Sequence, residues 1–178
     1  MEAVPLHIIH LSQDDPKKCT ARKLQRLGLA IIHEQIRRPP RRGFLLDPVA
    51  GTILGPDDAP SIEQGASIVA LDCSWKRLDD SLTQVQQRAP TLEGRTLPVV
   101  LAANPVSWGK PGRLSTVEAL AVSLILVERW GQAEEILRPF SFGEQFLKLN
   151  AQPLEAYAGA KTNAELVEIQ WEFFDKPE

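Results

Sequence analysis

The sequence is poor in cysteine and has no long, uninterrupted apolar run. Its two cysteines, Cys19 and Cys73, are too few for a disulfide framework or for a zinc site with four cysteine ligands. The longest apolar run, residues 117–127, contains Glu118 and Ser123 and is too short for a membrane span. The first residues lack the basic and then apolar order of a signal peptide. We therefore expect a cytoplasmic protein with reduced thiols.

Several motifs of nucleotide and metal chemistry are also absent. The chain has no Gly-x-Gly-x-x-Gly, no phosphate-binding loop with Gly-Lys-Ser/Thr, no His-Glu-x-x-His and no nucleophile elbow. Its three histidines are His7, His10 and His33, and no cysteine or carboxylate spacing completes a metal site with them. This pattern favours strand or surface histidines, and we expect no bound metal.

Charge is distributed unevenly, although the net charge is only −3. Residues 16–42 carry nine basic side chains and one acidic side chain, whereas residues 132–178 carry four basic and nine acidic side chains. Such a basic stretch is typical of a surface that binds a polyanion. The alternative is a set of solvated faces that meet acidic faces of the same protein. The candidate RNA-binding residues are Lys17, Lys18, Arg22, Lys23, Arg26, Arg37, Arg38, Arg41 and Arg42.

Apolar patterns and turn residues predict an α/β fold with a helical C-terminal half. Strands are expected at residues 5–11, 29–32, 44–46, 67–71 and 97–103. Helices are expected at residues 21–27, 78–88, 115–130, 132–137, 141–150, 153–157 and 162–174. Strands that alternate with helices favour a largely parallel sheet in the N-terminal half. We expect two domains, residues 1–92 and residues 93–178.

Two segments at predicted strand ends carry the candidate chemistry. Asp72 and Trp75 follow the strand at residues 67–71, and a carboxylate with an indole face can hold a cation such as the sulfonium of S-adenosylmethionine. A helix-capping Asp and a core Trp are the alternative. The second segment, residues 101–119, passes from an apolar run through a Gly/Pro loop to a helix, and its backbone groups can bind a ligand.

The same second segment contains a capping box and two cations. Ser115 and Glu118 have the spacing at which each side chain can bond the backbone amide of the other. The helix that follows is apolar almost all round and must be buried. Lys110 and Arg113 either contact phosphates or only keep the loop soluble.

Four segments in this order resemble the small-subunit ribosomal RNA aminocarboxypropyltransferases. They are DPKKCT at residues 15–20, LDCSWK at residues 71–76, LAANPVSWGKP at residues 101–111 and LSTVEA at residues 114–119. The later FLKLN at residues 146–150 and Tyr157 also fit the family. The similarity spans residues 6–157, and the chain resembles the compact prokaryotic form because it lacks a long acidic tail.

This resemblance implies a SPOUT-like fold with a deep trefoil knot around the cofactor site. It implies that the protein transfers the 3-amino-3-carboxypropyl group of S-adenosylmethionine to N3 of an N1-methylpseudouridine in small-subunit rRNA. Methylthioadenosine would be the by-product, and rRNA or a pre-ribosomal particle the partner. We expect a monomer, because the helical half would cover the face through which SPOUT-type methyltransferases usually dimerise.

The resemblance also assigns roles to individual residues. Thr20 and Thr116 would hold the amino-acid end of the cofactor, and the backbones of Leu71, Leu97 and Gly112 would contact its ribose and adenine. Trp75 would shield the methyl group, and Asp72 would either orient the sulfonium or accept the N3 proton. Gly112 stands where many members of the family carry a bulkier residue, a difference that a backbone contact survives.

Two other functions fit parts of the same pattern. A knotted methyltransferase would use the same cofactor but release S-adenosylhomocysteine. A non-catalytic RNA-binding module in ribosome assembly would use the basic stretch and need no cofactor.

Overall fold

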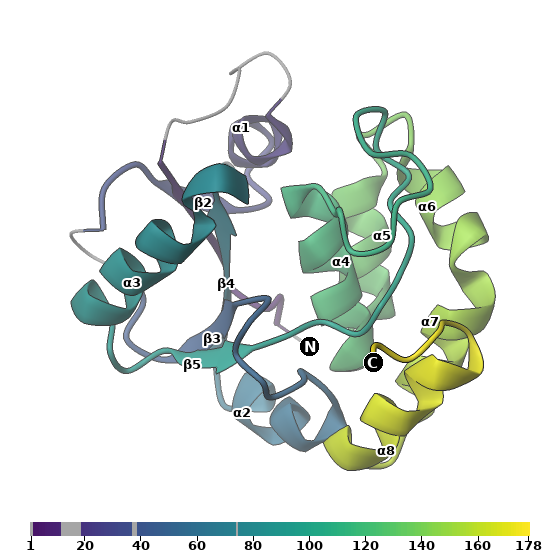
Figure 1. The fold of residues 1–178 in the computed structure, drawn as a ribbon. Helices are drawn as coiled ribbons and strands as arrows, with labels where there is room; N and C mark the ends of the chain where they lie inside the picture. The colour runs from purple at the N-terminus through teal and green to yellow at the C-terminus, as the bar shows by residue number, and fades with distance from the viewer. Residues whose placement is uncertain (1, 12–18, 37–38, 74) are drawn as a thin grey trace.

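The computed structural model describes residues 2–11, 19–36, 39–73 and 75–178, the last range without the side chain of Trp75. At its centre is a parallel sheet of five strands in the order β2-β1-β4-β3-β5 (Figure 1). The strands are β1 (Leu6–His10), β2 (Ile31–His33), β3 (Gly43–Leu46), β4 (Ser67–Asp72) and β5 (Glu93–Arg95). The predicted parallel sheet in the N-terminal half is confirmed.

Helices cover the sheet and make up the C-terminal part of the chain (Figure 1). The α-helices are α1 (Thr20–Arg26), α2 (Ala59–Glu63), α3 (Leu78–Arg88), α4 (Thr116–Leu126), α5 (Trp130–Leu137), α6 (Gly143–Leu149), α7 (Ala151–Ala158) and α8 (Asn163–Ile169). Three short 3₁₀ turns are η1 (Pro56–Asp58), η2 (Trp75–Arg77) and η3 (Gln170–Glu172). Among the described residues, none of these helices has the length and apolarity that a bilayer crossing requires.

Successive residues of the central strands pack on opposite faces of the sheet, as the alternation of side chains along a strand dictates. Ile8 and Ile68 belong to the large core that includes α4. Their neighbours Ile9 and Val69 belong to a smaller cluster with Val85 of α3. Because both faces are covered, β4 carries a continuous apolar run, and β1 has apolar residues on both faces, which is how they could be recognised in the sequence.

The buried axis of the helical part is α4. Nine of its eleven residues are buried, and it packs against β4, α1, α5 and α7. This burial on all sides explains its uniformly apolar sequence. The helix ends earlier than predicted because Glu128, at φ 65°, has a left-handed backbone that cannot continue a right-handed helix.

The predicted strand at residues 97–103 is wrong. The edge strand next to β3 is β5, and the run after it bonds the loop that follows and distant side chains instead of a strand of the sheet. The amide of Asn150 accepts from the Leu101 N–H at 2.7 Å and donates to the Leu101 carbonyl at 2.8 Å, as a neighbouring strand would. The Val99 N–H similarly donates to Gln170 Oε1 at 3.2 Å. Side chains of the C-terminal helices therefore replace the strand ladder.

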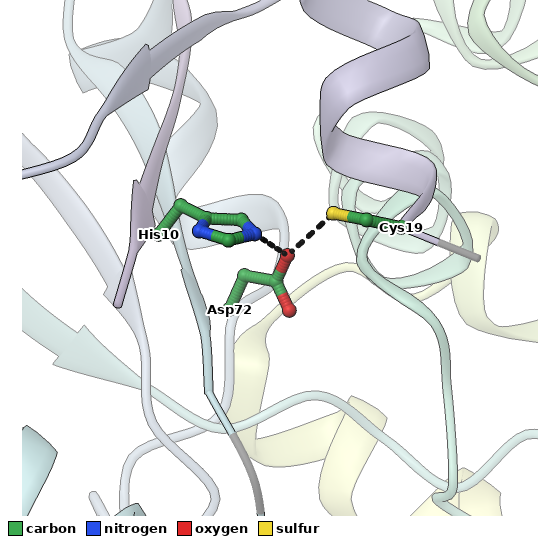
Figure 2. Close-up of side chains that lie close together, drawn as sticks. All are labelled: His10, Cys19 and Asp72. Carbon is green, nitrogen blue, oxygen red and sulfur yellow. Dashed lines mark hydrogen bonds and ion pairs between the residues drawn. The ribbon is translucent and has the colours of Figure 1, made fainter. Parts of the chain in front are cut away.

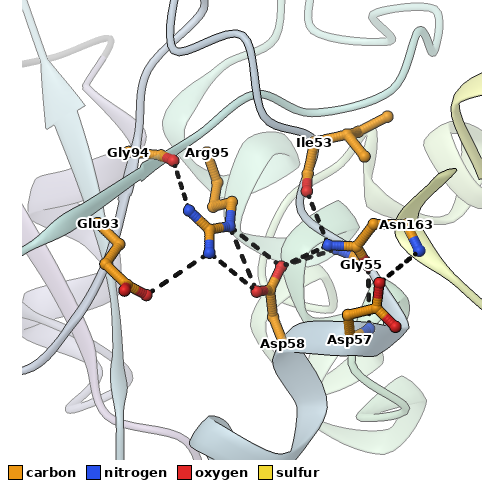
Figure 3. Close-up of polar contacts among 8 residues, drawn as sticks. All are labelled: Ile53, Gly55, Asp57, Asp58, Glu93, Gly94, Arg95 and Asn163. Atoms are coloured by element: carbon orange, nitrogen blue, oxygen red, sulfur yellow. Dashed lines mark hydrogen bonds and ion pairs between the residues drawn. The ribbon is translucent and has the colours of Figure 1, made fainter.

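A polar cluster fastens the far end of the chain to the sheet edge (Figure 3). Arg95 of β5 pairs with the buried carboxylate of Asp58 at 3.2 Å, and Asn163 of α8 donates to the same carboxylate at 3.2 Å. Asn163 and Asp57 also exchange two backbone-to-side-chain hydrogen bonds, at 2.9 and 3.0 Å. The strand β5 lies beyond residue 92 and still joins the sheet. The division of the chain into domains at residues 92 and 93 stays a prediction.

Candidate functional site

Three chemically different side chains meet at the carboxyl edge of the sheet (Figure 2). His10 ends β1 and Asp72 ends β4, and the parallel register places the two residues side by side. Cys19 precedes α1, which lies over that edge. His10 Nε2 lies 3.6 Å from Asp72 Oδ2, and the Cys19 thiol donates a hydrogen bond to the same oxygen at 3.1 Å.

This cluster is sheltered from solvent, which fixes the state of the thiol. The side chains of His10 and Asp72 are 1% and 11% exposed. Burial raises the pKa of Cys19 to about 11, and the hydrogen bond and negative charge of Asp72 act in the same direction. The thiol is therefore protonated at neutral pH and serves as a hydrogen-bond donor to the carboxylate.

A second contact joins α1 to the start of α4. Cys19 occupies the cap position of α1, and Thr20 is its first helical residue, one residue before the predicted start at residue 21. This leaves the Thr20 hydroxyl to accept from the Val117 N–H at 3.3 Å. Thr116, the first residue of α4, directly precedes Val117. The structure thus brings Thr20 and Thr116 together at a helix N-terminus, where an anion is stabilised.

The loop before α4 is held by one buried carboxylate, that of Glu118. Its Oε2 accepts from the Ala103 N–H at 2.7 Å. Its Oε1 accepts from Asn104 Nδ2 at 2.7 Å and from the backbone and hydroxyl of Ser115 at 2.9 and 2.8 Å. The Ser115 hydroxyl accepts in return from the Glu118 N–H, so the predicted capping box is confirmed and extended. Glu118 therefore ties both ends of the loop to the first turn of α4.

The loop itself, residues 104–113, folds back along the extended run before it. The Gly112 N–H donates to the Val100 carbonyl at 3.0 Å, with Gly112 at φ 71°, a conformation that favours glycine. Gly109 likewise has a positive φ, of 73°, at the tip. The same loop carries Val106 and Trp108, whose side chains are 77% and 54% exposed. A well-bonded loop therefore presents an apolar aromatic surface to solvent.

Three of the remaining predicted cofactor residues lie at or just beyond the carboxyl ends of strands. Leu71 directly precedes Asp72 in β4, and Leu97 comes two residues after the end of β5 and packs on the large core. Trp75 opens η2 directly after β4, but its side chain lies outside the described residues. The backbone of Gly112 is held in the loop by its bond to the Val100 carbonyl.

The predicted RNA-binding residues divide into two groups. On α1, Arg26 is exposed and Arg22 pairs with Glu34 at 3.4 Å, whereas Lys23 donates to the Pro139 carbonyl at 2.6 Å and holds α1 against the helical part. Arg41 and Arg42 precede β3 and so lie at the opposite edge of the sheet, about 20 Å from Asp72 by strand length. Lys17, Lys18, Arg37 and Arg38 lie outside the described residues.

Two residues of the cluster, His10 and Cys19, were not predicted as site residues. His10 is the last residue but one of the predicted strand at residues 5–11, and Asp72 directly follows the predicted strand at residues 67–71; adjacent parallel strands bring such residues together. The signal was therefore present in the strand pattern, but the sequence does not say which strands are neighbours.

The comparisons with known proteins identify the family of the chain. A family model described as "Ribosome biogenesis protein, C-terminal" matches residues 44–174. A 16S rRNA aminocarboxypropyltransferase from Methanosarcina acetivorans is 44% identical over 94% of this chain and 92% of its own length. One from Halobacterium salinarum is 41% identical over 97% of this chain and 98% of its own. The chain belongs to the 16S rRNA aminocarboxypropyltransferase family.

A solved member of this family has the same fold. The SAM-dependent rRNA:acp-transferase Tsr3 from Vulcanisaeta distributa superposes with a TM-score of 0.80 at 35% identity, over 94% of this chain and 97% of that one. The resemblance inferred from the four sequence segments is thereby confirmed. Five parallel strands followed by a helical part are thus the architecture of an aminocarboxypropyltransferase.

A second family model, "Possible Fer4-like domain in RNase L inhibitor", matches residues 4–35. Iron–sulfur clusters of the ferredoxin type need four cysteine thiolates. The chain has two cysteines and only Cys19 within the matched range, so its residues do not fit such a cluster.

Proposed function

We propose that this protein transfers the 3-amino-3-carboxypropyl group of S-adenosylmethionine to 16S rRNA during ribosome biogenesis. The acceptor is N3 of an N1-methylpseudouridine, and methylthioadenosine is released. The observation that carries the proposal is the meeting of Asp72, Thr20 and the start of α4 at one sheet edge, in a member of this family. This edge offers a carboxylate to a cation and a helix N-terminus to an anion.

The residues present fit the charges of the cofactor. Asp72 holds the positive centre by its carboxylate, which the Cys19 thiol keeps in one orientation. Thr20, Thr116 and the first turn of α4 bind the α-carboxylate. The backbones of Leu71, Leu97 and Gly112 contact the ribose and adenine. S-adenosylmethionine, when bound, supplies an electrophilic carbon next to its sulfonium.

Acid–base chemistry at the acceptor falls to Asp72. The acceptor base must lose its N3 proton as the new N–C bond forms, and the Asp72 carboxylate accepts that proton. A base that also holds the cation keeps the two reacting groups close, which contributes to catalysis through proximity. Trp75 keeps the role that the resemblance gives it, shielding of the methyl group.

The acceptor RNA is bound over α1 and the loop at residues 104–113. Arg22 and Arg26 contact phosphates, together with Lys17 and Lys18. Trp108 stacks on a base next to the acceptor, and Lys110 and Arg113 contact the adjoining phosphates. The exposed indole of Trp108, on a loop fixed by backbone hydrogen bonds, supports this assignment. Arg37, Arg38, Arg41 and Arg42 form a second patch that contacts a more distant part of the particle.

The finer features implied by the resemblance remain part of the proposal. They are a SPOUT-like deep trefoil knot, a monomeric state, a cytoplasmic location and a pre-ribosomal particle as the natural substrate. Burial of α4 on nearly all sides supports the monomer, because little of that helix is left to meet a second copy.

The deciding experiment uses S-adenosylmethionine labelled separately on the methyl group and on the carboxypropyl carbon. Small-subunit rRNA that lacks the modification is the acceptor, and Asp72→Asn is the matched control. We expect only the carboxypropyl label to enter RNA, at a rate that Asp72→Asn strongly reduces. Entry of the methyl label would instead indicate a methyltransferase. Entry of neither label, without cofactor binding in calorimetry, would indicate an RNA-binding assembly module.

A further inference from the structure

The cluster of His10, Cys19 and Asp72 has the composition of a transition-metal site. The three residues offer an imidazole nitrogen, a thiol sulfur and a carboxylate oxygen, and these atoms all lie within 4.8 Å of one another. They come from the end of β1, the cap of α1 and the end of β4. Within the described parts of the chain, no other group of three or more His, Cys, Asp and Glu side chains meets this criterion.

The distances match those of a tetrahedral ion after small movements. Zinc binds sulfur at about 2.3 Å and nitrogen or oxygen at about 2.0 Å, so tetrahedral angles put S···O at about 3.5 Å and N···O at about 3.3 Å. The structure has 3.1 Å between Cys19 Sγ and Asp72 Oδ2, and 3.6 Å between His10 Nε2 and the same oxygen. The sulfur and the nitrogen must approach each other to about 3.5 Å, a closure of about 1.3 Å at most. Rotations of exposed or half-buried side chains such as Cys19 suffice for such shifts.

The donor set also selects the kind of metal. Thiolate and imidazole are ligands of zinc and its neighbours, whereas magnesium and calcium prefer oxygen ligands alone. Three protein ligands with a fourth position left open are the arrangement of zinc sites that exchange their fourth ligand. His10 is buried, while Cys19 and Asp72 are partly exposed, so an ion can enter from the side of Asp72 and Cys19.

We propose that His10, Cys19 and Asp72 bind one Zn²⁺ ion, and that this ion excludes S-adenosylmethionine. The exclusion of S-adenosylmethionine rests on the proposed function, in which Asp72 holds the sulfonium. Zn²⁺ displaces the thiol proton to solvent and occupies the carboxylate. The ion, the Cys19 thiolate and the Asp72 carboxylate together have no net charge, so the edge loses the negative charge that the cofactor needs. Free zinc is thereby a competitive inhibitor of the transferase.

The first test is calorimetric titration of the metal-free protein with ZnCl₂ alone. We expect one ion per chain, with affinity at least tenfold lower in Cys19→Ser and in His10→Gln. Cys73→Ser is the matched control, because it removes the other thiol, next to Asp72 but outside the cluster, and should bind zinc as the native chain does. Equal affinity in Cys19→Ser and the native chain would overturn the site. Urea unfolding of each variant identifies any that fail to fold.

Cobalt gives a readout that is independent of stability. Co²⁺ bound to a thiolate has a sulfur-to-metal absorption band, which we expect in the native chain and in Cys73→Ser but not in Cys19→Ser. Absence of the band in a native chain that binds cobalt would place the ion elsewhere and overturn the assignment.

The second test is titration with S-adenosylmethionine at fixed zinc concentrations. We expect the apparent dissociation constant of the cofactor to rise as one plus the ratio of zinc concentration to its own dissociation constant. If zinc binds and the cofactor affinity does not change, the exclusion is refuted while the metal site stands. If the cofactor fails to bind even without zinc, the proposed function fails, and the zinc titration still decides the metal site.

Discussion

The buried carboxylate of Glu118 allows a quantitative test of how the loop beside the site is held. We consider Glu118→Gln, which keeps the size of the side chain and removes its charge. An amide has one acceptor oxygen and one donor nitrogen, whereas both oxygens of Glu118 accept hydrogen bonds. Whichever way the amide turns, its nitrogen must face a donor.

The smaller loss arises when the nitrogen replaces Oε2, because Oε2 accepts one hydrogen bond and Oε1 accepts three. The Ala103 N–H then lacks an acceptor, which costs about 1–3 kcal/mol in a buried site. The three remaining bonds lose their charge assistance, at about 1 kcal/mol each. The neutral glutamine also avoids the cost of burying a charge, which offsets part of this sum. We expect a net destabilisation of about 2–4 kcal/mol.

Equilibrium unfolding in urea measures this loss, and the midpoint should fall with an unchanged slope. The control is Glu144→Gln, the same substitution in an exposed carboxylate that pairs with Lys148, for which we expect no measurable change. Affinity for S-adenosylmethionine should fall with the stability, because the loop carries Gly112. A Glu118→Gln variant as stable as the native chain, within about 0.5 kcal/mol, would refute the reasoning.

Three further predictions concern the surface, the pH dependence and the helical part. Trp108→Ala should weaken RNA binding by about 1–3 kcal/mol without lowering stability, because the exposed indole offers a stacking surface. Fluorescence anisotropy with a small-subunit rRNA fragment measures the affinity, and an unchanged affinity would contradict this prediction. Burial lowers the pKa of His7 and of His33 from 6.5, and the charge of His33 lowers that of His7 further. The unfolded chain therefore binds more protons, so the free energy of unfolding should fall as the pH drops through 6.5, and His33→Gln should flatten this dependence. Asn150→Leu removes both partners of the Leu101 backbone and should destabilise the fold by roughly 2–5 kcal/mol in urea unfolding, whereas an unchanged midpoint would show that the strand-like pairing contributes nothing.

Elements with strong local signals were predictable from the sequence. The helix at residues 78–88 was predicted with the bounds it has, and β4 was predicted to within one residue, because a polar boundary follows each apolar pattern. The capping box of Ser115 and Glu118 was also predictable, since its two members lie three residues apart. Such features depend on contacts within a single turn or strand.

What could not be predicted depends on contacts between distant segments. Residues 97–103 have the apolar pattern of a strand, but their backbone partners are the loop that follows and side chains as far as 71 residues away. Cys19 and Asp72 meet across 53 residues, and only the order of the strands places His10 beside them. A sequence pattern identifies a strand but not its neighbour, so the pair of strand-end residues stayed unrecognised.

The same long-range contacts explain why the helical part is needed for the site at the edge of the sheet. The extended run at residues 97–103 positions the loop that carries Trp108 and Gly112, through the bond from the Gly112 N–H to the Val100 carbonyl. That run is held from its other side by Asn150 and by Gln170, which belong to the last third of the chain. A loosened C-terminal helix would therefore displace the loop before it disturbed the sheet. Cofactor and RNA affinity should consequently fall in variants of the helices that carry Asn150 and Gln170 while the sheet stays folded, although these helices do not themselves contact the ligand.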